Sequence, residues 1–135
     1  MVAPFLDRFT AEELDALPYG VVQLDAMGTI RSFNAAEAEN AGFTTRPLGQ
    51  NYFLEVYPSA NAAEFYGRFL EAFDEKDLDD TFLFTFSCSH LPRRVQVRMY
   101  YCVRTASTWI FTAQPDGTPL VRLPEVVETL LPVGR

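Results

Sequence analysis

The last third of the chain contains apolar runs with strand-like alternation, and these constrain its fold most strongly. In the central run, Val95, Val97 and Met99 alternate with polar side chains, which is the period of a strand with one buried face. Similar runs lie on both sides of it, so that strand-like segments occupy residues 80–88, 93–105 and 107–114.

A second strand signal lies near the beginning, in YGVVQLDAMGTIRSFN, residues 19–34. Val22 and Leu24 alternate with polar neighbours, and a turn around residues 25–28 precedes another apolar stretch, which predicts a hairpin. Two strands do not complete a useful sheet alone, so we expect them to join the three later runs. The sequence therefore predicts a five-stranded antiparallel sheet.

Helical segments separate the two groups of strands. Thr10 and Glu13 fit a capping box at the start of a short helix, and Asn34 can cap the stretch AAEAEN. YFLEVYP then predicts a short helix or turn that ends at Pro58.

The longest helix is expected in NAAEFYGRFLEAFDEKD, residues 61–77, with Asn61 as its cap. Phe65, Phe69 and Phe73 recur every four residues in it, which predicts one apolar stripe. With the middle helices covering one face of the sheet, the chain reads as an α+β fold. This is the layout of a PAS domain, and the order of elements alone also fits other α+β folds.

The chain has 135 residues and is 48% hydrophobic, which predicts one packed domain. We expect residues 1–114 to form this domain, with its short N-terminal helix. Residues 115–135 form a proline-containing tail with a possible short helix at Glu125–Leu131. Such a tail can fold back on the domain or bind a protein partner.

The net charge of −7 and the pI of about 4.6 argue against binding to nucleic acid or anionic membranes. The nearest basic cluster is Arg93, Arg94, Arg98 and Arg104, in which alternation places Arg93 on the face opposite Arg94 and Arg98. We interpret the latter pair as part of a solvated outer sheet face.

No apolar run approaches the ~18 residues of a membrane span, and the first residues lack the basic region of a secretory signal. Cys88 and Cys102 have neither metal-site spacing nor the density of a disulfide framework. We therefore expect a cytoplasmic protein with reduced thiols and no metal site.

Several motifs resemble the photoactive yellow protein family. They are YGVVQLDAMGTIRSFNAAE, GQNYFLEVYP, AAEFYGRF, TFLFTFS and VQVRM, and together they cover roughly residues 14–113. The resemblance implies a PAS domain that holds p-coumaric acid as a thioester on a cysteine. In that family a tyrosine and a glutamic acid hydrogen-bond the chromophore phenolate, and blue light isomerises the chromophore to start a signal.

The chain departs from this pattern around the chromophore. By the resemblance, Glu37 is the glutamic acid and Ser59 stands at the attachment cysteine, where a hydroxyl is a far poorer nucleophile. Phe33 replaces the hydrogen-bonding tyrosine without supplying a hydroxyl. The remaining departures are Ala41 for a threonine, Phe43 for an arginine and Tyr57 for a small residue. We therefore expect that covalent attachment and the photocycle are lost.

Three functions remain open for such a pocket. In the first, a PAS module binds a small aromatic or unsaturated ligand noncovalently, such as a p-coumarate-like molecule, and signals its presence. No covalently bound cofactor is expected. The pocket residues would be Val22, Phe33, Glu37, Phe43, Tyr52, Val56, Tyr57, Ser59, Phe86 and His90.

The second function is a small isomerase, cyclase or hydrolase that acts on an unsaturated acyl compound. Glu37 and His90 would be its acid and base, and Cys88 or Ser59 its nucleophile. Cys88 also fits a packed apolar group, His90 an exposed turn residue and Ser59 a turn hydroxyl bonded to local backbone. The third function is an interaction domain whose cavity is filled by Phe33, Phe43 and Tyr57.

Overall fold

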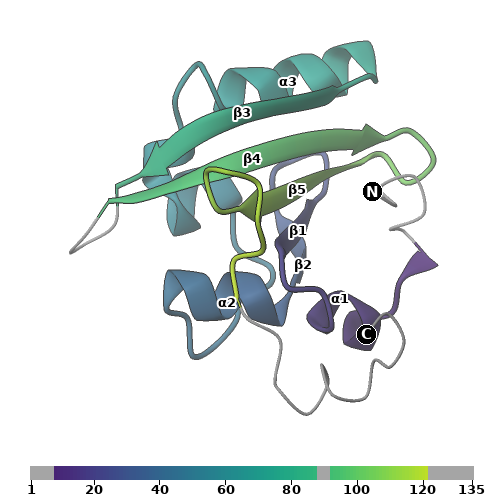
Figure 1. Ribbon diagram of the computed structural model, residues 1–135. Coiled ribbons are helices and arrows are strands. Elements are labelled where there is room, and N and C mark those ends of the chain that lie inside the picture. Colours follow the sequence, from purple (N-terminus) through teal and green to yellow (C-terminus); the bar gives the residue numbers. More distant parts are fainter. Residues whose placement is uncertain (1–7, 88–91, 122–135) are drawn as a thin grey trace.

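A computed structural model describes residues 8–87 and 92–121 of the chain. Its centre is one five-stranded antiparallel sheet, as the sequence predicts. β1 pairs with β5, so the first and the last strand meet in the middle of the sheet (Figure 1). The strands lie in the order β2 (Ile30–Phe33), β1 (Gly20–Leu24), β5 (Ser107–Ala113), β4 (Arg93–Cys102) and β3 (Asp79–Phe86).

Apolar clusters lie on both faces of this sheet. The larger cluster lies between the sheet and the helical segments from the middle of the sequence, as the sequence predicts. The smaller one lies on the opposite face, where Leu14 of α1 (Ala11–Asp15) packs with Val21, Trp109 and Phe111. The larger cluster is covered by α2 (Ala35–Ala41), a π-helical turn η2 (Tyr52–Val56), a 3-10 turn η3 (Pro58–Ala60) and α3 (Tyr66–Glu75).

The buried side chain of Asn34 joins α1, β1 and α2. Its Oδ1 accepts hydrogen bonds from the backbone N–H groups of Val21 at 2.9 Å and Glu37 at 3.1 Å. Its Nδ2 donates to the carbonyls of Leu14 at 2.8 Å and Tyr19 at 2.9 Å. The predicted N-cap of α2 is therefore confirmed, and the same amide also holds α1 in place.

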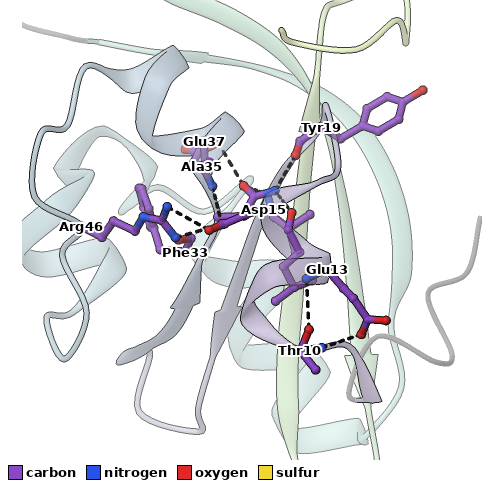
Figure 2. A network of polar contacts seen from close by, with 11 residues as sticks. Thr10, Glu13, Asp15, Tyr19, Phe33, Ala35, Glu37 and Arg46 are labelled. Atoms are coloured by element: carbon purple, nitrogen blue, oxygen red, sulfur yellow. Dashed lines mark hydrogen bonds and ion pairs between the residues drawn. The ribbon is translucent and has the colours of Figure 1, made fainter. Parts of the chain in front are cut away.

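Asp15 at the end of α1 adds a second connection to this region (Figure 2). Its carboxylate accepts from the Ala35 N–H at 2.9 Å and from both terminal nitrogens of Arg46 at 2.9 and 3.1 Å. Arg46 also donates to the carbonyl of Phe33. At the start of α1, the predicted capping box of Thr10 and Glu13 is present.

The helix expected at 61–77 is shorter than predicted. It begins at Tyr66 because Phe65, which is fully buried, has a non-helical backbone, and Asn61 is therefore not its cap. Phe65 and Phe69 face the core, but Phe73 is 39% exposed. The predicted stripe is wrong at Phe73. Within α3, a step of four residues turns by about 400° around the helix axis, so Phe73 lies some 40° further round the helix than Phe69.

The first residues of the predicted tail turn back onto the domain. Leu120 is buried in the larger cluster, and its N–H donates to the Pro18 carbonyl at 3.0 Å. The candidate helix at Glu125–Leu131 lies outside the described residues. Within the described ranges, no helix has the length and apolar character needed to cross a membrane.

Replacing Asn34 by Asp tests its role as the joint between three elements. Asn34→Asp keeps the capping oxygen but removes the two donors to Leu14 and Tyr19, leaving their buried carbonyls opposite a carboxylate. We expect a loss of roughly 2–4 kcal/mol in the free energy of unfolding, measured by urea denaturation. Asn61→Asp, at an exposed position, is the control and should change stability by less than about 0.5 kcal/mol. Equal effects of the two substitutions would contradict this role.

Candidate functional site

Glu37 is the centre of the site. It lies in the first turn of α2 and has no solvent-exposed surface, as the pocket interpretation requires. Ala36 and Ala38, its neighbours in α2, are also buried, which shows how closely this helix approaches the rest of the core. The Asn34 cap fixes the Glu37 backbone and therefore the direction from which its side chain enters.

Three side chains from different elements contact the Glu37 carboxylate. The Tyr57 hydroxyl donates to Oε2 at 2.6 Å, and the Thr112 hydroxyl of β5 donates to Oε1 at 2.7 Å. Arg93 of β4 forms an ion pair, with its Nη2 3.6 Å from Oε2. Each carboxyl oxygen of Glu37 therefore has a hydroxyl partner, and a cation lies beside Oε2.

Arg93 extends its guanidinium over two aromatic rings of the site. The distance from its Cζ to the ring centre is 4.8 Å for Phe86 and 5.8 Å for Tyr57, and its side chain is only 13% exposed. Strand alternation predicted that Arg93 faces away from Arg94 and Arg98, and this is confirmed. Its contact with Glu37 was not foreseen, because alternation gives the face of a strand but not the partner across the core.

Aromatic rings surround Tyr57. Its ring centre lies 4.9 Å from those of Tyr52 and Phe86 and 6.2 Å from that of Phe43. Phe33 contacts Phe43 in turn, at 5.5 Å. The structure therefore brings together the three residues expected to fill the cavity, and Tyr57 is the one that reaches Glu37.

The π-helical turn places Tyr52 and Tyr57 against each other. Asn51 caps this turn by accepting from the N–H groups of Phe53 and Leu54, and the Tyr57 N–H donates to the Tyr52 carbonyl at 2.8 Å. This i to i+5 bond brings residues five apart to the same side of the turn, whereas an α-helix bonds residues four apart. Such turns are frequent at functional sites.

Both tyrosines are held in their neutral form. Burial raises the pKa of Tyr57 far above its ordinary value, and the adjacent Glu37 raises it further. Burial followed by the charge of Glu37 also raises the pKa of Tyr52. Among the described residues the buried Tyr52 hydroxyl has no hydrogen-bond partner, which costs about 1–3 kcal/mol.

Ser59 lies at the edge of this site. Its Oγ accepts from the Ser87 N–H at 3.2 Å, so its hydroxyl contacts the backbone directly after β3. Val22 is a buried core residue, and Val56 packs against the same cluster while partly exposed. Cys88 and His90 lie outside the described residues.

Two further residues of the site were not predicted. Thr112 lies in a strand whose residues are all buried, and its position two residues after Ile110 places it on the inner face. Gly20 of β1 lies so close to the carboxylate that a methyl group there would collide with Glu37 Oε1 and Thr112 Oγ1.

The chain has relatives that are named photoactive yellow protein. Photoactive yellow protein from Rhodothalassium salexigens is 37% identical over 100 residues, which are 73% of this chain and 80% of that protein. The chain belongs to the photoactive yellow protein family. The family predicted from the sequence motifs is thus confirmed, although no protein-family model matches the chain.

Solved structures agree with this assignment. The photoactive yellow protein domain of the sensor histidine kinase Ppr from Rhodospirillum centenum has a TM-score of 0.76 and 36% identity, covering 82% of this chain and 97% of that domain. The PAS domain of the quorum-sensing receptor RpfR from Cronobacter turicensis, solved with BDSF, has a TM-score of 0.57 and 19% identity. The match covers 72% of this chain and 93% of that domain. These likenesses confirm the predicted PAS fold.

Substitution of Gly20 tests how tightly β1 packs against the carboxylate. In Gly20→Ala the new methyl group would collide with Glu37 and Thr112 and lie 3.1 Å from Leu120 Cδ1. We expect a loss of about 1–3 kcal/mol in the free energy of unfolding. Gly67→Ala is the control, because nothing lies within 4 Å of its added methyl group and alanine favours a helix. A Gly20→Ala variant as stable as Gly67→Ala would contradict the packing described.

The raised pKa values of Tyr52 and Tyr57 predict a loss of stability in alkali. Above pH 10 the unfolded chain releases both protons while the folded chain keeps them, so stability is complete below this pH and falls above it. We expect a decrease of about 1.4 kcal/mol per pH unit for each tyrosine, measured by urea unfolding between pH 9 and 12. Tyr57→Phe should remove one tyrosine's share. Ionisation of all six tyrosines near pH 10 in the folded chain would contradict this.

Proposed function

We propose that this chain is a signalling PAS domain that works without covalently attached p-coumaric acid, and that Tyr57 fills the place of the chromophore. The 2.6 Å hydrogen bond from the Tyr57 hydroxyl to the buried Glu37 carboxylate carries this proposal. In the family pattern described above, Glu37 would hold the phenolate of the chromophore. Here a phenol that belongs to the chain contacts the same carboxylate.

The state of the Tyr57 phenol supports loss of the photocycle. A glutamic acid that holds a phenolate must be protonated and donate. Burial and Glu37 raise the pKa of Tyr57, so its phenol keeps its proton and offers Glu37 no phenolate to hold, while Thr112 and Arg93 contact the same carboxyl group. The site therefore already contains a matched donor, acceptor and counter-ion without an added chromophore.

The surroundings of Ser59 support loss of covalent attachment. A serine hydroxyl becomes an effective nucleophile when a neighbouring base removes its proton. Among the described residues, the partner given by the structure for the Ser59 Oγ is the Ser87 N–H, which donates to it and cannot take its proton. We further propose that the domain acts in the cytoplasm and signals to a protein partner through its C-terminal tail.

A noncovalent ligand that displaces Tyr57 is the second candidate function. The unpaired hydroxyl of Tyr52 favours it, because a ligand with an acceptor group would relieve this buried donor. Displacement would also leave Glu37 and the rings of Phe43 and Phe86 as walls for a flat molecule. The RpfR PAS domain, which has the same fold, is solved with a bound small molecule, BDSF.

Tyr57→Ala tests the proposed function by emptying the place of the ring. The variant should lose about 3–5 kcal/mol of stability, and phenol, which matches the ring removed beyond Cβ, should restore about 2.7 kcal/mol at one hundred times its dissociation constant. Thermal unfolding with and without phenol measures both effects. Tyr57→Phe keeps the ring and is the matched control, which phenol should not stabilise.

The unmodified chain provides the decisive comparison. After exposure to an activated p-coumaroyl thioester, we expect its denatured mass to remain that of the bare chain and its unfolding temperature to be unchanged by p-coumarate. Stabilisation by p-coumarate without a mass increase would instead favour the ligand that displaces Tyr57. A coumaroyl adduct on Ser59 or Cys88 would overturn the proposed function and restore a photoreceptor or an acyl-enzyme.

A further inference from the structure

The two edge strands of the sheet differ in how many of their outward backbone N–H and C=O groups are hydrogen-bonded. At the β2 edge, the Ile30 N–H donates to the Gln50 carbonyl and the Ile30 carbonyl accepts from the Gly49 N–H, both at 2.9 Å. At the other edge β3 pairs with β4 alone, and within the described ranges no backbone group bonds its outer side. Among the described residues, the outer side of β3 therefore has backbone donors and acceptors that no other backbone group bonds.

Apart from two carboxylates at one end, β3 lacks several of the devices that usually protect an edge strand. It has eight residues in continuous register with β4, without a bulge, lysine or proline. Its middle is uncharged, with Thr81 and Thr85 exposed and Leu83 45% exposed between them. Natural edges are generally blunted by charge, proline, bulges or shortness, because a long flat edge is a template for another strand.

The charges of β3 lie at one end and are already paired. Arg98 binds Asp79 through two hydrogen bonds of 2.8 Å, and Arg68 of α3 binds Asp80 at 2.9 Å. The Arg98 hydrogen bonds also lower the pKa of Asp79. These carboxylates consequently do not prevent a second strand from approaching the uncharged part of β3.

We propose that β3 pairs with β3 of a second copy of this chain, antiparallel about a two-fold axis at Leu83, to join two sheets into one. In this register Leu83 lies opposite the partner's Leu83, and Thr81 opposite the partner's Thr85. Leucine and threonine pairs of this kind stabilise antiparallel strands.

The distribution of charge selects this arrangement. Antiparallel pairing at Leu83 sets Asp80 opposite the partner's Phe86, so the acidic ends lie apart. Parallel pairing would bring the acidic ends together and is disfavoured. The net charge of −7 on each copy still opposes association, so the dimer should be weak and should tighten as salt screens the repulsion. The proposal is independent of what fills the Glu37 site.

Sedimentation equilibrium of the full 135-residue chain, over a range of protein concentrations and at low and high salt, tests the dimer. We expect a monomer–dimer equilibrium that shifts toward dimer in high salt. Leu83→Lys should make the chain monomeric, because it sets two like charges against each other on the axis. Leu54→Lys, at a leucine that is 63% exposed on η2, is the matched control and should dimerise like the unmodified chain.

Two double variants test the register itself. Thr81→Lys with Thr85→Glu places opposite charges across the axis twice, and should preserve or strengthen the dimer. Thr81→Lys with Thr85→Lys places like charges there, and should abolish it. Far-UV circular dichroism and urea midpoints establish that all variants are folded. A monomeric unmodified chain, a dimer unaffected by Leu83→Lys, or equal behaviour of the two double variants would overturn the proposal.

Discussion

The buried Glu37 carboxyl group is the constraint on which the rest of the structure depends. A carboxyl group without partners in an apolar interior is very unfavourable, so its hydrogen bonds and its neighbouring cation must come from the protein itself. α2 supplies the carboxylate, β5 supplies Thr112, β4 supplies Arg93 and the loop before η3 supplies Tyr57. The need to satisfy one side chain thereby fixes the relative positions of four segments that are distant in sequence.

Tyr57 shows how one side chain can change what a site is able to bind while Glu37, the central residue of the site, is retained. The π-helical turn directs this ring toward Glu37 and packs it against Tyr52. The Tyr52 hydroxyl has no hydrogen-bond partner among the described residues, which is a cost of this packing. Burial of the aromatic rings offsets this cost, because each buried ring removes a large apolar area from water.

The sequence predicted the elements whose signals are local, and it missed what depends on contacts across the core. Alternation was sufficient for the strands, and the Thr10 and Asn34 caps followed from side chains next to the helices they begin. The start of α3 was wrong because burial of Phe65 overrides the helical tendency of the preceding residues. Within the site, the family motif proposed Glu37 as a pocket residue, and Tyr57 was named among three residues that could fill the cavity. The contacts of Arg93 and Thr112 with Glu37 depend on strand order and register, and no local pattern contains these.

The path of the last described residues has a consequence for how such a domain can transmit a signal. Leu120 is anchored to the Pro18 carbonyl and lies against Gly20, which itself borders the Glu37 carboxylate. The last described residues therefore lie one side chain away from the Glu37 site. A rearrangement around Glu37 would reach the C-terminal segment through Leu120, without first deforming the sheet.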